Sequence, residues 1–147
     1  MRILFIRLTC LAALALAAAC SGATDPDQGV REPSVIQFYD APPEITLPAT
    51  VRAGETFSVA VMTWAGGCSR PDGTETTVSG ATADVRPYDF RFTGVEISCP
   101  DVSRNYVHET PVRFNTPGQA TVRVHGIREP GGETVVLTRA ITVQPAG

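Results

Sequence analysis

Apolar and polar positions alternate along most of the chain beyond residue 34. Within residues 55–64, Phe57, Val59 and Val61 share one face of an extended strand. Further rows of the same period are Ile45, Leu47 and Val51; Tyr88, Phe90 and Phe92; Val112 and Phe114; Ala120, Val122 and Val124; and Val135, Leu137, Ile141 and Val143. A repeat of two is typical of strands with one buried face, and no stretch after residue 20 holds a helical period over ten residues. The pattern therefore predicts an all-β domain.

Glycine and proline separate these rows, at 53–54, 66–67, 71–73, 117–118 and 130–132. Seven or eight short strands with such turns predict a single antiparallel β-sandwich. Arg139 interrupts the last row, which predicts a bulge or a strand that leaves the core midway. Prolines inside the strand region are expected on edge strands or at switches between sheets. They are Pro42, Pro43, Pro48, Pro87 and Pro111.

The N-terminus has a different pattern from the rest of the chain. Residues 1–7 carry two arginines and no acid, residues 8–19 are almost wholly Leu and Ala, and Cys20 follows a run of three alanines. A basic head, a short apolar middle and small residues at the exit are typical of a secretory signal. Twelve apolar residues are too few for a transmembrane helix.

The cysteine at the exit makes this segment resemble a bacterial lipoprotein signal, although Ala17 stands where that family prefers Leu. The resemblance implies that Cys20 is acylated, becomes the new N-terminus and binds the lipid membrane of the cell envelope. Ser21 resembles the residue after the cysteine in lipoproteins sent to an outer membrane, where the cell has one. The alternative is ordinary cleavage after Ala19, which would leave a periplasmic or secreted protein.

Three parts of the chain follow from these patterns. Residues 1–19 are the expected signal peptide, 20–33 the acylated cysteine with a flexible tether, and 34–147 the sandwich domain. The tether is expected because 21–33 is rich in Gly, Pro and acids, with Val30 as its one sizeable apolar residue.

Charge excludes several classes of function. Removing residues 1–19 takes away two arginines and no acid, so the net charge falls from −3 to −5. An acidic domain is a poor partner for nucleic acid. All 12 basic residues are arginine, and the absence of lysine excludes Schiff-base chemistry and Walker-type phosphate binding. No cofactor is expected.

Four cysteines are present, and Cys10 leaves with the signal. With Cys20 acylated, Cys68 and Cys99 remain as one pair in an oxidising compartment, which predicts a disulfide. The alternative is a redox or metal pair, but the two cysteines lack C-x-x-C spacing.

Two segments resemble bacterial immunoglobulin-like domains. Residues 47–59 are similar to the second strand of such domains, and 114–124 to the penultimate strand. The resemblance implies an immunoglobulin-like β-sandwich and says little about function. Trp64 precedes Cys68, and Cys99 falls before the penultimate strand, unlike antibody domains. We therefore expect the disulfide to staple an irregular segment, 66–101, and not the centres of the two sheets.

Candidate chemistry is sparse. Trp64 and Arg70 flank the first cysteine and form the candidate binding surface, because a loop pinned by a disulfide beside an aromatic presents a rigid surface. The competing interpretation is that Trp64 closes the end of the core. His108 is in phase with core residues, whereas His125 lies on an outward face.

The sequence predicts a non-enzymatic binding or structural module at the bacterial envelope, because it lacks a nucleophile–base signature. Its expected partner is an envelope protein or a glycan, besides the membrane. The alternative is an exported metal- or ligand-binding protein that uses loop acids with His108 and His125. No metal-ligand spacing supports a metal site.

Overall fold

The computed structural model describes residues 28–94 and 98–147, which contain ten strands and no helix. In chain order they are β1 (Gly29–Pro33), β2 (Val35–Phe38), β3 (Ile45–Thr46), β4 (Thr50–Arg52), β5 (Thr56–Gly66), β6 (Ser69–Ser79), β7 (Thr82–Phe92), β8 (Ser103–Arg113), β9 (Gly118–Glu129) and β10 (Glu133–Gln144). The described part of the chain therefore has no helix long and apolar enough to span a bilayer.

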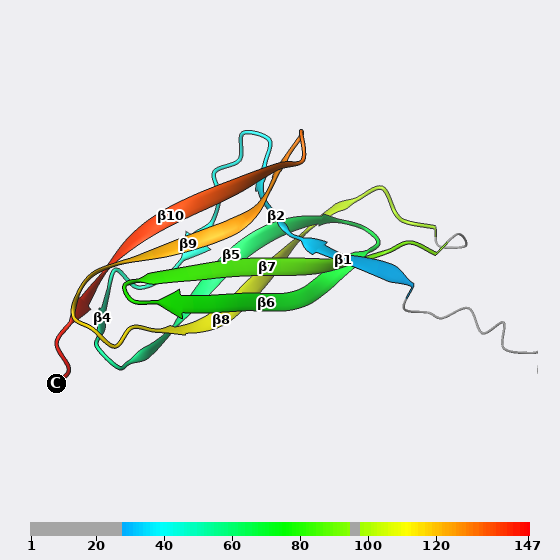
Figure 1. Cartoon of the computed structure of the whole chain (residues 1–147). Helices are drawn as coiled ribbons and strands as arrows, with labels where there is room; N and C mark the ends of the chain where they lie inside the picture. Colours follow the sequence, from blue (N-terminus) through cyan, green and yellow to red (C-terminus); the bar gives the residue numbers. More distant parts are fainter. Residues whose placement is uncertain (1–27, 95–97) are drawn as a thin grey trace, which may run out of the picture.

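The strands form two layers that pack face to face (Figure 1). One layer runs β6, β7, β9, β10 and the short β4, and the other holds β3, β5 and β8. β1 pairs with the second half of β7, while β2 pairs with β9 and meets β5 where Val35 lies opposite Trp64. β2 thus ties the two layers together along one side.

Side chains connect the layers on the other side, between β6 and β8. The hydroxyls of Thr76 and Thr110 lie 2.7 Å apart, and the Tyr106 hydroxyl donates a hydrogen bond of 2.9 Å to the carbonyl of Ser69. Hydrogen bonds between polar groups therefore connect the two layers at this seam, whereas apolar packing connects them in the rest of the interior.

The predicted all-β sandwich is confirmed, with two corrections to its details. The described residues hold ten strands, not seven or eight, because two of the additional strands, β1 and β6, have polar sequences. Three pairs are parallel, namely β10 with β4, β2 with β9 and β7 with β9, so the sheet is not purely antiparallel. Alternation reports which face of a strand is buried and says nothing about the direction of its neighbour.

The core confirms most of the predicted rows. β5, β8 and β9 bury the faces expected from their alternation, and Val51 of β4 joins them, with Ile45 and Leu47 partly buried. The buried apolar set is Ile36, Val51, Phe57, Val59, Val61, Ala83, Val85, Val112, Phe114, Ala120, Val122, Val124, Ile141 and Val143. Burial of this apolar surface is the main stabilising contribution to the fold.

The face of β7 was predicted with the wrong phase. Its buried row is Ala83, Val85, Pro87 and Asp89, and the aromatic row faces outward. Arginines cover these aromatics: Arg31 lies 3.7 Å from the centre of the Tyr88 ring, and Arg70 lies 4.7 Å from that of Phe90 and 5.7 Å from that of Phe92. Such cation–π contacts stabilise aromatic rings outside a core.

The segment 66–101 is not irregular, as the sequence predicted, but contains the β6–β7 hairpin. Apolar alternation could not reveal β6, because the side chains it turns inward include Thr74 and Thr76. Their hydroxyls reach His108 and Thr110 across the seam, at 3.5 Å and 2.7 Å. Hydrogen bonding compensates for the burial of these polar groups.

Arg139 causes no bulge, because β10 and β9 keep one register from Glu133 to Val143. The other prediction, a strand that leaves the core midway, agrees with the burial of the residues of β10. Ile141 and Val143 are fully buried, whereas Val135 and Leu137 are only partly buried, so β10 leaves the core toward its beginning.

The prediction for the prolines is confirmed only in part: Pro111 lies on an edge strand, whereas Pro42, Pro43 and Pro48 lie outside the strands. Pro87 occupies the point at which the partner of β7 changes from β9 to β1, and Pro111 lies in β8, which pairs through its backbone with β5.

The domain begins earlier than predicted. Gly29–Pro33 is strand β1, in register with Tyr88–Phe92, so these five residues belong to the domain and not to a tether. Backbone pairing with β7 stabilises them despite their polar sequence. The signal peptide, Cys20 and the tether up to residue 27 lie outside the described residues.

Candidate functional site

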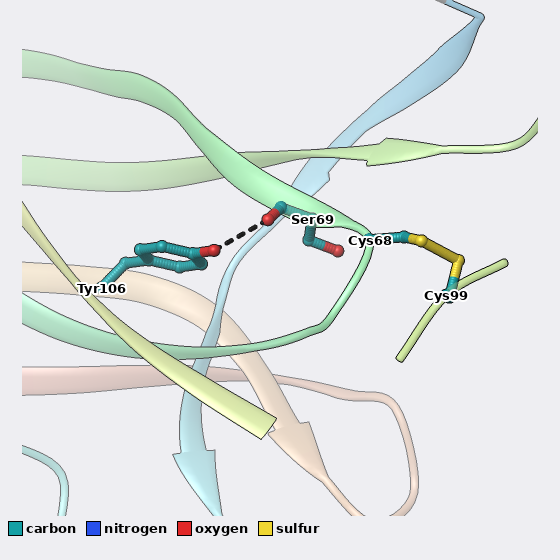
Figure 2. Close-up of a disulfide and its surroundings, with 4 residues drawn as sticks. All are labelled: Cys68, Ser69, Cys99 and Tyr106. Atoms are coloured by element: carbon teal, nitrogen blue, oxygen red, sulfur yellow. Dashed lines mark hydrogen bonds between the residues drawn. A yellow bond between two sulfur atoms is a disulfide. The ribbon is translucent and has the colours of Figure 1, made fainter. Parts of the chain in front are cut away.

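The disulfide marks one end of the sandwich. Cys68 lies in the turn between β5 and β6, Cys99 lies ahead of β8, and the two are bonded with Cα atoms 5.1 Å apart (Figure 2). The predicted pairing is confirmed. Gly67 is required here, because a Cβ atom at this position would collide with the carbonyl oxygen of Pro100.

Replacing both cysteines by alanine should lower the free energy of unfolding by about 2–4 kcal/mol, because the disulfide restricts the unfolded chain. The sheet should persist, since the apolar core lies elsewhere. Urea unfolding of the double variant, followed by circular dichroism, measures the loss. An unchanged unfolding midpoint relative to the oxidised wild type would contradict the prediction.

A hollow of about 570 Å³ opens at this end of the sandwich. β1 and β2, the end of β5, the start of β6, the end of β7 and residues 99–103 line it. We call this space the hollow. Its size falls within the range of small-molecule sites, about 300–1,000 Å³.

Aromatic rings form one wall of the hollow. The rings of Phe38 and Trp64 stack with centres 6.1 Å apart and planes 16° apart, and the edge of Tyr39 meets Phe38 at 4.8 Å. The Tyr39 amide donates to the carbonyl of Glu129, which fixes this corner. The stack joins β2 to β5, so the wall is held by both layers.

Five charged residues of the described part of the chain also line the hollow. The Nε atom of Arg91 donates to both carboxylate oxygens of Glu32, at 3.0 and 3.1 Å. Asp89 contributes a carboxylate although its residue is only 4% exposed. Asp101 and Glu129 complete the acidic part.

Asp89 belongs to a buried row of polar groups that joins the layers. His108 Nε2 lies 3.1 Å from Asp89 Oδ1, and its Nδ1 lies 3.5 Å from the Thr74 hydroxyl. A hydroxyl, an imidazole and a carboxylate in series is the order of a nucleophile–base–acid triad. However, Thr74 and His108 lie outside the lining of the hollow, and His108 is 4% exposed. The row therefore acts as a structural link between β6, β7 and β8.

Two buried hydroxyls lie near this row. Ser34 and Thr63 are completely buried, and their side-chain oxygens have no hydrogen-bond partner among the described residues. Neither residue belongs to the lining of the hollow, because their sequence neighbours line it and successive side chains of an extended strand point to opposite faces. Buried polar atoms without a hydrogen-bond partner are rare in folded proteins.

The two residues of the predicted binding surface are separated. Trp64 lines the hollow, where it stacks on Phe38. Arg70 instead lies over Phe90 and Phe92, outside the lining. Sequence reasoning missed Phe38 and Asp89. An acid in phase with Ala83, Val85 and Pro87 was a usable signal, but the adjacent aromatic row obscured it.

The two histidines do not form a joint site. His108 is buried beside Asp89, and His125 shares Asp84 with Arg123 on the outer face of the sandwich. The hydrogen bonds from Arg123 and His125 lower the pKa of Asp84 to about 2, because both favour the ionised carboxylate. Within residues 28–94 and 98–147, no three Cys, His, Asp or Glu side chains are grouped as a metal site would require.

Comparisons with known proteins identify no relative. No family model, no curated protein and no solved structure matches this chain. The function must therefore be argued from the site.

Proposed function

We propose that this protein is a non-enzymatic binding module of the bacterial envelope, anchored by an acylated Cys20, that holds its ligand in the hollow. The observation that carries the binding role is a hollow walled by stacked aromatics and fixed by the Cys68–Cys99 disulfide. Concave sites with apolar walls and a few converging polar groups are the usual places for ligands.

The position of the hollow relative to the start of the domain supports the link to an anchor. The carbonyl of Gln28 accepts a hydrogen bond from Thr93, Gly29 pairs with Phe92, and the Phe92 amide donates to the carbonyl of Cys68. Phe92 and Cys68 both line the hollow. Eight residue steps from Cys20 to Gln28 reach at most about 28 Å, so an anchored Cys20 would keep the hollow close to the membrane surface.

Photo-crosslinking tests the binding site without knowledge of the ligand. Val102 lines the hollow and is 46% exposed, whereas Val136 lies on β10, outside the lining, and is 48% exposed. With benzoylphenylalanine at either position, irradiation of intact cells should give a discrete adduct at residue 102 and none at residue 136. Identical adducts at both positions, or none at either, would contradict the proposal.

Anchoring has its own test. Cys20→Ser should move the protein from the detergent-extracted membrane fraction to the soluble exported fraction. The variant lacks the residue that would carry the acyl chains, and stable anchoring needs more than one such chain. The mass of the mature N-terminal peptide provides the check. A wild-type protein that is soluble without detergent and carries no lipid would refute the anchor, while the binding role would still stand on the crosslinking.

A further inference from the structure

We propose that the hollow selects an organic cation, namely an ammonium or guanidinium group attached to an apolar body. This inference rests on the proposed binding function and adds the chemical class of the ligand. It follows from three properties of the described lining: its charge, its polar floor and its aromatic wall.

The lining carries an excess of negative charge. Four carboxylates, those of Glu32, Asp89, Asp101 and Glu129, face one guanidinium, that of Arg91. The Nε atom of Arg91 already donates hydrogen bonds to both carboxylate oxygens of Glu32. Arg91 is the one arginine of the described lining, so Asp101 and Glu129 have no second arginine opposite them there. A concave site with acidic walls concentrates cations and repels anions.

The floor of the hollow can bind a donor. Asp89 is 4% exposed, and His108 engages its Oδ1 atom. Because Asp89 lines the hollow, its remaining access is from that side. A carboxylate that keeps this access accepts hydrogen bonds from a donor that enters the hollow.

The wall suits the same ligand. Trp64 and Phe38 both line the hollow and stack on each other, and Trp gives the strongest cation–π attraction among the aromatic side chains. A cation on an apolar body therefore gains from the rings, from the carboxylates and from burial of its apolar part. An anion would gain only from the last of these.

Three probes with one aromatic body isolate the charge: benzylammonium, benzyl alcohol and phenylacetate. Trp64 is the only tryptophan, so intrinsic fluorescence reports directly from the wall of the hollow. At low salt, benzylammonium should bind about tenfold more tightly than benzyl alcohol, and phenylacetate should bind weakest. Equal affinities, a preference for phenylacetate, or no fluorescence change with any probe would overturn the inference. The crosslinking at residue 102 would separately decide whether the hollow binds anything.

Matched variants locate the selectivity. Asp89→Asn should reduce the preference for benzylammonium over benzyl alcohol to about twofold. Glu129→Gln should also reduce this preference, and it leaves the buried contact between Asp89 and His108 in place. Glu133→Gln removes the same charge on exposed β10, outside the lining, and should leave the preference unchanged. Glu129→Gln keeps the test decisive if Asp89→Asn fails to fold. An equal loss in Glu133→Gln would assign the preference to overall charge and refute the site.

Discussion

Val122→Asp is expected to unfold the domain or to make it insoluble. Val122 is completely buried in β9, between Ala83 of β7 and Arg139 of β10 in register. Arg139 lies opposite this position, but a carboxylate there would still be moved from water into an apolar core, and such burial costs on the order of several kcal/mol per ion even beside a cation. Thermal melts followed by circular dichroism measure the loss where soluble protein is obtained.

The control places the same charge on the solvent face. Thr138 is exposed on β10, opposite Arg123, so Thr138→Asp should change stability by about 0.5 kcal/mol or less. Comparable losses in the two variants would show that the inward face of this layer has been assigned wrongly.

His108→Ala should lower the free energy of unfolding by about 3–5 kcal/mol, because it leaves the buried carboxylate of Asp89 without its partner. The same change also removes the contact to Thr74 across the seam. Urea unfolding at neutral pH gives the difference in stability.

The other histidine is the natural comparison. His125→Ala removes an ion-pair partner from Asp84, but Arg123 still holds that carboxylate, so the loss should stay below about 1 kcal/mol. The double variant Asp89→Asn/His108→Ala should be less destabilised than the sum of its single variants, since the two groups interact directly. A loss of stability in His108→Ala that is as small as the loss expected for His125→Ala would mean that the buried row has no structural role.

The site was predictable only in part. Trp64 beside Cys68 pointed to this end of the molecule, and the disulfide followed from the count of cysteines. Phe38 could not be found in this way, because it reaches Trp64 only once β2 lies against β5. Arg70 lies on β6 over the rings of Phe90 and Phe92, a position that depends on the pairing of β6 with β7.

The phase of β7 shows the limit of hydrophobicity as a guide. Three aromatics at alternate positions are the strongest apolar signal in this strand, yet they face outward. Arginines of β1 and β6 cover them, and those strands are brought there by pairing with β7. The inward row instead contains Asp89, whose burial depends on His108 from the opposite layer.

What the sequence by itself determined is the all-β class, most of the buried rows and the partner of each remaining cysteine. The fold class and the buried rows follow from the local alternation of apolar and polar residues. The disulfide follows because the other two cysteines are accounted for by the N-terminal segment. Both arguments need only the sequence of one chain. Tertiary structure alone decided the parallel pairs, the polar seam between β6 and β8, the outward aromatics of β7 and the hollow. Each of these depends on groups that are distant in sequence, and their energies exist only when two strands meet.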